Sequence, residues 1–196
     1  MDSSLLKKAA DIICSGGVIV YPTDTAYGLG ADAGNVDAVQ KVFDLKGRDL
    51  TKPIHVVVEN LAMARKLVEF NPLAEKIFKK YLPGPLTIVL PKKPGVSDLL
   101  TAGLPTLGIR IPDNTVCREL SRLTHLPFTT TSANLSGQKT PYQISDVIPG
   151  ADLVIDAGQL PEVLPSTVID LTKGKINILR RGPISFSEDD LVVEGE

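Results

Sequence analysis

Short segments rich in cations, hydroxyls and glycines directly follow apolar stretches in this chain of 196 residues. The first, Pro22 to Gly30, combines small hydroxyls with glycines, which let a ligand approach the backbone closely. The second, Lys46 to Pro53, has three cations within seven residues, a pattern typical of a phosphate clamp. Open α/β sheets bind ligands where their strands end, so this arrangement predicts a site for an anionic ligand.

Four later segments add to this pattern. Arg110 alternates with apolar neighbours in an expected strand, and an arginine on the buried side of a strand needs an anionic partner. Residues 129–137 carry hydroxyls and amides that suit phosphate and ribose oxygens. Segments 165–168 and 178–182 supply Ser166 and Arg180. Taken singly, each segment is equally consistent with a structural role, such as a polar turn or a helix end whose cations complement the helix dipole.

Several familiar kinds of site are excluded. A Ser–His–Asp triad or a histidine metal site would need His55 or His125, which we interpret as a strand residue in an apolar setting and a surface residue. No segment matches the phosphate loop that ends in Gly-Lys-Ser/Thr. The run from Gly28 to Ala33 fits the dinucleotide pattern only weakly, because six residues separate it from the preceding strand. Cys14 and Cys117 lack metal-ligand spacing and indicate a reducing compartment.

Composition and charge set broader limits. Hydrophobic residues make up 43% and charged residues 22% of the chain, the balance of a globular protein. The net charge is −2, but five acidic residues lie within 188–196, so residues 1–187 carry 21 basic and 18 acidic groups. A surplus of this size disfavours nucleic acid as the main ligand. No apolar run reaches 18 residues and the N-terminus does not resemble a signal peptide, so we expect a cytoplasmic protein without a membrane segment.

Helices and strands must position these segments. Serines near the N-terminus predict a helix that ends at about residue 15, and Asn35, Asn60, Asn71 and Asp113 are predicted N-caps of later helices. The elements alternate at first and strands cluster at the end, which predicts a mixed sheet covered by helices in one domain, 1–187, followed by a mobile acidic tail, 188–196. The predicted strands cover 18–21, 54–58, 86–90, 107–111, 127–131, 152–156, 167–171 and 176–180.

In this order and spacing, the segments resemble the family that includes bacterial threonylcarbamoyl-adenylate synthases, also called the YrdC-like family. The resemblance covers residues 5–186, nearly the whole chain, and the chain stops where longer members carry another domain, so it is similar to the short form. Seven ordered blocks carry the resemblance: Pro22-Thr23-Asp24-Thr25 with Tyr27-Gly28-Leu29-Gly30, Lys46-Gly47-Arg48, Pro83-Gly84-Pro85-Leu86-Thr87, Arg110-Ile111-Pro112, Ser132-Ala133-Asn134-Leu135-Ser136-Gly137, Ser166-Thr167-Val168 and Ile178-Leu179-Arg180.

The resemblance implies an α/β fold with a twisted, mixed, largely antiparallel sheet and outer helices around a positively charged, concave cavity. It implies the conversion of L-threonine, bicarbonate and ATP to threonylcarbamoyl-AMP and pyrophosphate. That product feeds the threonylcarbamoyl modification of adenosine 37 in tRNA, through a downstream tRNA-modifying transferase complex. Mg²⁺ is expected to accompany ATP, and no metal site made of protein ligands alone is expected.

The resemblance also implies roles for individual residues. Catalysis is expected to rest on charge stabilisation by Lys46, Arg48 and Arg110, because the reaction requires no covalent nucleophile from the protein. In the family, the position of Val57 belongs to the threonine pocket and carries histidine in some relatives, and Asp24 stands where many relatives have glutamate. The implied ATP contacts are Arg48, Lys52, Thr106, Ser132, Asn134, Thr140 and Arg180, and the implied threonine contacts are Thr25, Arg110, Thr130 and Ser166.

Two alternatives remain open from the sequence. A double-stranded RNA-binding module of the same fold, with no synthase activity, would show steep salt dependence, and a weak contact with tRNA or double-stranded RNA is compatible with either function. A carbamoyl-adenylate enzyme that uses carbamoyl phosphate would be a large protein with zinc-finger and acylphosphatase segments, which this chain lacks.

Overall fold

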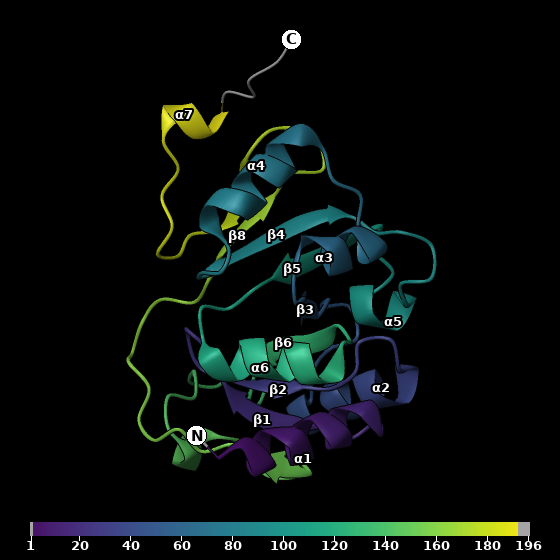
Figure 1. Cartoon of the computed structure of the whole chain (residues 1–196), viewed down its shortest axis with the longest axis vertical. Helices are drawn as coiled ribbons and strands as arrows, with labels where there is room; N and C mark the ends of the chain where they lie inside the picture. The colour runs from purple at the N-terminus through teal and green to yellow at the C-terminus, as the bar shows by residue number, and fades with distance from the viewer. Residues whose placement is uncertain (1, 192–196) are drawn as a thin grey trace.

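Nine strands form one mixed sheet in the computed structural model, which describes residues 2–191 (Figure 1). Their order across the sheet is β7-β1-β2-β6-β3-β5-β4-β8-β9. The pairs β1/β7, β3/β5 and β4/β8 are parallel and the other five are antiparallel. The prediction of a mixed, largely antiparallel sheet is therefore confirmed.

The elements have the following bounds. The strands are β1 (Ile19–Pro22), β2 (Tyr27–Gly30), β3 (His55–Val57), β4 (Leu86–Pro91), β5 (Thr106–Arg110), β6 (Phe128–Ser132), β7 (Leu153–Val154), β8 (Thr167–Asp170) and β9 (Asn177–Arg180). The helices are α1 (Ser3–Cys14), α2 (Val36–Lys46), α3 (Leu61–Leu67), α4 (Pro72–Tyr81), α5 (Asp98–Thr101), α6 (Thr115–Thr124), the 3-10 helix η1 (Ile144–Asp146) and α7 (Glu188–Leu191).

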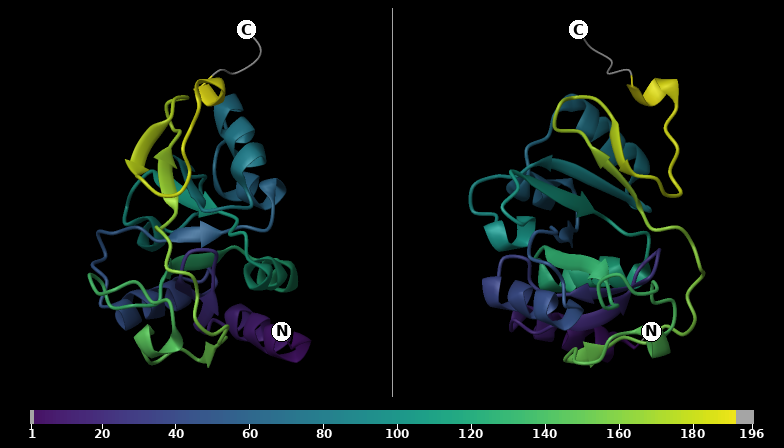
Figure 2. Two further views of the ribbon diagram at one scale, coloured as in Figure 1. Left: turned by 90° about the vertical axis from the view of Figure 1, so that its left-hand side faces the viewer. Right: turned by 180° about the vertical axis from the view of Figure 1, so that it is seen from behind.

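Helices cover both faces of the sheet, and the side chains of each strand alternate between two cores. In β1, Val20 packs in the core shared with α2 to α5, whereas Ile19 and Tyr21 pack in the smaller core under α1 and α6. The left view of Figure 2 shows α1 and α6 on one side of the sheet and α2 on the other. Val57 and Phe128 are buried in the smaller core, on the face of the sheet that α6 covers. Thr130, two residues after Phe128, lies on the same face but outside this core, among polar side chains.

Asparagine caps begin four of the helices, as predicted for three of them. The side chains of Asn35, Asn60 and Asn71 each accept a hydrogen bond from a backbone N–H of the helix that follows. The cap of α6 is Asn114, whose carboxamide accepts from the amides of Val116 and Cys117, so the prediction of Asp113 was wrong by one residue.

The segment after β1 differs most from expectation. No strand was predicted within residues 22–30, but Tyr27–Gly30 is strand β2, which pairs with both β1 and β6. Two glycines in four residues hide the strand pattern, and the structure requires one of them: a Cβ on Gly30 would lie 2.9 Å from the ring of Tyr21. Helix α5 was also not predicted.

Part of the predicted acidic tail packs on the domain. Residues 188–191 form α7, and the carboxylate of Asp190 is buried against the Lys80 ammonium and the Tyr81 hydroxyl of α4. Residues 192–196 lie outside the described part of the chain, so a mobile tail stays a prediction for them. Within residues 2–191, no helix has the length and apolar character needed to cross a membrane.

Candidate active site

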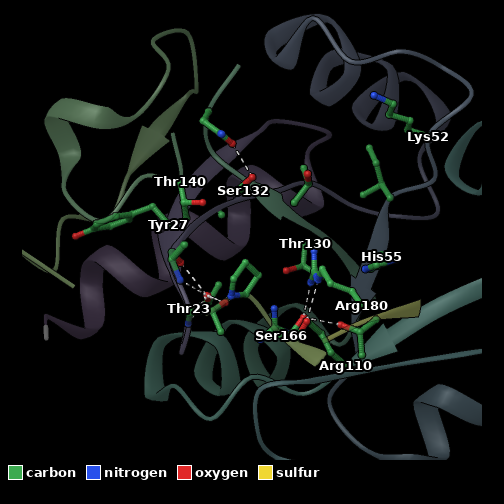
Figure 3. Close-up of a pocket in the computed structure, with 18 of the residues that line it drawn as sticks. Thr23, Tyr27, Lys52, His55, Arg110, Thr130, Ser132, Thr140, Ser166 and Arg180 are labelled. Atoms are coloured by element: carbon green, nitrogen blue, oxygen red, sulfur yellow. Dashed lines mark hydrogen bonds between the residues drawn. The ribbon is translucent and has the colours of Figure 1, made fainter. Parts of the chain in front are cut away.

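A cavity of about 520 Å³ opens on the sheet face beyond α6 (Figure 3). Strands β2 to β6, the loop after α2 and the segments around β8 and β9 all contribute to its lining. Four of its lining side chains are cations, and none of the described lining residues is acidic. Ten of the twelve predicted site residues line it: Thr25, Arg48, Lys52, Arg110, Thr130, Ser132, Asn134, Thr140, Ser166 and Arg180.

The loop after α2 folds around the side chain of Arg48. Gly47 ends the helix in the left-handed conformation, with φ of 52°. Arg48 then donates from Nε to the carbonyl of Lys52 at 3.1 Å and from Nη2 to the carbonyl of Pro53 at 2.9 Å. Burial lowers the pKa of this guanidinium from its usual value. The remaining N–H groups of Arg48 are available to a ligand in the cavity.

Arg110, at the end of β5, is buried together with an acidic partner from the loop after β1. Its Nη2 lies 2.5 Å from Oδ1 of Asp24, and the two side chains are 7% and 9% exposed. The other carboxylate oxygen of Asp24 accepts from the amide of Asp113 at 3.2 Å. The Nε of Arg110 is buried and has no hydrogen-bond partner among the described residues. A buried donor without a partner costs roughly 1–3 kcal/mol, so a bound anion would recover free energy here.

Arg180 of β9 and Ser166, just before β8, hold each other in place. Arg180 donates from Nε to the Ser166 carbonyl at 3.0 Å and from Nη2 to the Ser166 hydroxyl at 2.9 Å. The same hydroxyl lies 3.0 Å from Oγ1 of Thr87 on β4. Gly182 permits the close approach of the two segments, because a Cβ there would lie 2.3 Å from the carbonyl oxygen of Pro165. Three elements therefore fix one guanidinium at the cavity wall.

The threonines after β1 form a compact turn at the cavity. The Thr23 hydroxyl accepts from the amides of Thr25 and Ala26, both at 3.1 Å, and donates to the Ala26 carbonyl at 2.7 Å. This turn carries Thr25 into the lining and places Asp24 beside Arg110.

Lys46 does not line the cavity, contrary to its predicted role as a phosphate ligand. Its side chain is only 2% exposed, and its ammonium donates to the carbonyl of Ser132, to the carbonyl of Asn134 at 2.8 Å and to Oδ1 of Asn134 at 3.3 Å. Burial, together with the charge of Arg48, lowers the pKa of Lys46 to about 8. With these contacts the ammonium holds the turn that follows β6, and we correct its role to that of a positioning residue.

Two other expected positions also lie outside the cavity. Thr106 is at the far end of β5 from Arg110, where it pairs with Pro91 of β4. Val57 packs in the smaller core with Phe128. Neither contributes to the lining, so the ATP contact predicted for Thr106 has no support from the geometry of the cavity.

Six polar lining residues were not predicted as site residues: Thr23, Tyr27, His55, Thr87, Thr131 and Gln138. Thr23, Tyr27 and Thr87 fall within the motifs that carry the family resemblance, so a signal was available in the sequence for these three. The sequence predicts His55 to be an ordinary strand residue, and its place in the lining depends on Gly108, its neighbour on β5. A Cβ on Gly108 would lie 2.5 Å from Cδ2 of His55, so the glycine leaves room for the imidazole.

A metal ion would find few protein ligands in this site. No group of three or more His, Cys, Asp or Glu side chains in residues 2–191 is arranged to hold one. The cavity instead offers guanidinium, ammonium, hydroxyl and amide groups, which bind phosphates and carboxylates.

Comparisons with known proteins agree with this geometry. The Sua5/YciO/YrdC family model, described as "Telomere recombination", matches residues 11–182. A Methanocaldococcus jannaschii protein is 42% identical over 90% of this chain and 84% of its own length. The threonylcarbamoyl-AMP synthase of Pyrococcus abyssi is 34% identical over 96% of this chain, which spans only 57% of that enzyme. The crystal structure of P. abyssi Sua5 complexed with L-threonine superposes with a TM-score of 0.87 and 35% identity, covering 90% of this chain and 54% of that one. The chain belongs to the Sua5/YciO/YrdC family.

Proposed function

We propose that this chain is a threonylcarbamoyl-AMP synthase, which converts L-threonine, bicarbonate and ATP to threonylcarbamoyl-AMP and pyrophosphate. The observation that carries the proposal is the convergence of Arg48, Arg110 and Arg180 on one cavity whose other polar groups are mostly hydroxyls and amides. A triphosphate and an amino-acid carboxylate together bring several negative charges, which cations at fixed points would stabilise.

The triphosphate is assigned to the wall formed by Arg48, Lys52 and Arg180. Both arginines use some of their N–H groups to hold their own backbone surroundings, so their geometry is set before a ligand arrives. Each hydrogen bond to a charged group contributes about 1.5–3 kcal/mol, so the loss of one such cation would lower activity about ten- to a hundredfold. Ser132, Asn134 and Thr140 supply neutral contacts for the nucleotide.

Threonine is assigned to the region around Arg110. The guanidinium would bind the substrate carboxylate, using the Nε donor that is unsatisfied in the structure. Asp24 holds Nη2 of the same guanidinium and leaves Nε without a partner among the described residues. Thr25, Thr130 and Ser166 are the remaining threonine contacts.

The chemistry would depend on positioning rather than on covalent catalysis. A carbamate oxygen of N-carboxythreonine attacks the α-phosphorus of ATP, and pyrophosphate leaves. Mg²⁺ is expected to enter bound to ATP as part of the substrate. A cytoplasmic location and transfer of the product by a tRNA-modifying complex stay predictions. The P. abyssi relative is named as a threonylcarbamoyl-AMP synthase, and no observation on residues 2–191 favours the RNA-binding alternative.

The test is a direct assay of the purified chain with ATP, bicarbonate and each amino acid in turn. Pyrophosphate release should depend on both threonine and bicarbonate, and mass spectrometry should detect threonylcarbamoyl-AMP. Arg110→Ala and Arg48→Ala should each remove most of this activity while the proteins stay folded. Threonine-independent pyrophosphate release, or wild-type activity in either variant, would contradict the assignment.

A further inference from the structure

His55 presents an imidazole to the cavity from the first position of β3. Its ring lies across Gly108 of β5, and its register partner on β6 is Thr130, a proposed threonine contact. Figure 3 shows His55 close to Thr130, Arg110 and Arg180. The imidazole is therefore at the end of the cavity assigned to threonine.

The charged groups that shift the pKa of this imidazole are all cations. Burial lowers the pKa of His55 most, and the guanidiniums of Arg180, Arg110 and Arg48 lower it further, to about 3. These groups come from β9, β5 and the loop after α2, whereas β6 faces His55 with the neutral Thr130. Neither ring nitrogen has a hydrogen-bond partner among the described residues. The ring is thus a neutral group with a free lone pair.

The reaction proposed above releases a proton, and the inference rests on that function. The threonine ammonium and bicarbonate give the carbamate, water and one proton: the nitrogen bonds to the carbon of bicarbonate, and the hydroxyl group of bicarbonate departs as water. The ammonium must lose a proton before its lone pair can attack. The later attack of the carbamate oxygen on the α-phosphorus breaks the bond to pyrophosphate and needs no further proton acceptor.

Among the described lining residues, His55 is the one side chain that offers an uncharged nitrogen with a basic lone pair to that proton. The cations Arg48, Lys52, Arg110 and Arg180 are already protonated, and the hydroxyls and amides are too weakly basic. The phenol of Tyr27 is engaged with the carbonyl of Gly158 at 2.7 Å and the amide of Ala157 at 2.9 Å. We propose that His55 is the general base that takes the proton from the threonine amine as the carbamate forms.

Substrate binding would prepare His55 for this step. The triphosphate and the threonine carboxylate bring negative charge to the same three arginines, so protonated imidazole becomes less unfavourable once both are bound. When pyrophosphate leaves, the uncompensated guanidiniums favour return of the proton to solvent. Proton uptake is thereby linked to occupancy of the cavity.

The test compares the two directions of the reaction in His55→Gln. The forward rate from threonine and bicarbonate should fall about 10²- to 10⁴-fold, the usual contribution of a general base. The reverse reaction forms ATP from supplied threonylcarbamoyl-AMP and pyrophosphate, and its rate in His55→Gln should stay within about threefold of the wild-type rate. This direction requires only the attack of pyrophosphate on the α-phosphorus. The N-carboxythreonine that is released can then leave the site and lose CO₂ in solution. Calorimetric affinities for threonine and ATP should also be retained. His125→Gln, which changes the exposed second histidine, is the matched control and should leave both directions unchanged.

Gly108→Ala provides a second variant, since its methyl group must displace the His55 ring while leaving the base in the protein. It should slow the forward direction more than the reverse. Equal losses in both directions for His55→Gln, or a normal forward rate, would overturn the proposal. A wild-type chain that formed no threonylcarbamoyl-AMP but still bound it and made ATP from it would refute the role of His55 as a general base and leave the site assignment intact. If the wild-type chain catalysed neither the forward nor the reverse reaction, the proposed function itself would fail.

Discussion

Lys46 offers a sharp test of how the cavity is held, because its ammonium supports the turn after β6 without contributing to the lining. Lys46→Met removes the charge and the three hydrogen bonds but keeps most of the side-chain volume. The two shortest bonds, to the carbonyls of Ser132 and Asn134, each join a charged donor to a buried acceptor. At about 1.5–3 kcal/mol per bond, the free energy of unfolding should fall by about 3–6 kcal/mol at pH 7.

The effect should also depend on pH in a defined direction. The folded chain holds Lys46 with a pKa of about 8, below the ordinary lysine value of 10.5. Between these values the unfolded chain binds more protons than the folded one, so this group makes stability rise with pH across that window. The slope reaches up to about 1.4 kcal/mol per pH unit in wild type and is absent in Lys46→Met. The stability difference between the two proteins should therefore widen as the pH increases from 8 to 10.

Urea denaturation at pH 7, 8, 9 and 10 would measure these differences. Lys41→Met is the control from the same helix, because its ammonium makes one bond, to the carbonyl of Gly16, at the protein surface. It should lose about 1 kcal/mol or less at every pH. A stability difference for Lys46→Met that is small, or that does not change with pH, would refute the reasoning.

Three further predictions concern contacts outside that turn. Asp24→Asn should raise KM for threonine about tenfold or more with little change for ATP, because Arg110 loses its buried charge partner; steady-state kinetics in each substrate would show it. Thr87→Val should lower kcat/KM for threonine about fivefold through loss of the 3.0 Å contact with Ser166, and Thr87→Ser should restore it. Hydrogen bonds from Lys80 and Tyr81 hold the pKa of Asp190 below its usual range, although burial of the carboxylate raises it. The ionised Asp190 therefore stabilises the folded chain above the unfolded-state pKa of 3.8, and this stabilisation is lost as the pH falls below 3.8. Asp190→Asn should accordingly lower Tm at pH 7 by more than it does at pH 3, as thermal unfolding would reveal.

Local chemistry explains why much of the fold was predictable. Asn35, Asn60 and Asn71 cap helices through side-chain contacts within three residues, and the apolar runs that form β3 and β4 need no distant partner to be recognised. Strand β2 was missed because its glycines carry no strand preference, and only pairing with β1 and β6 holds it in the sheet.

The site was predictable as a set of segments but not as a set of roles. Lys46 and Arg48 are two residues apart and carry the same charge, yet their side chains have different surroundings. Lys46 donates to carbonyls that lie 86 and 88 residues further along the sequence, whereas Arg48 lines the cavity. His55 is in the lining because Gly108, on a neighbouring strand, leaves space for it. Both outcomes depend on packing between strands that are distant in sequence, which spacing along the chain does not report.

A crystal structure of the chain soaked with ATP and L-threonine would examine the assignment of the cavity most directly. We predict phosphate oxygens within hydrogen-bond distance of Arg48 and Arg180, and the threonine carboxylate on the Nε side of Arg110, with both ligands in the same hollow. Ligand density on another face of the sheet, or threonine bound away from Arg110, would contradict it.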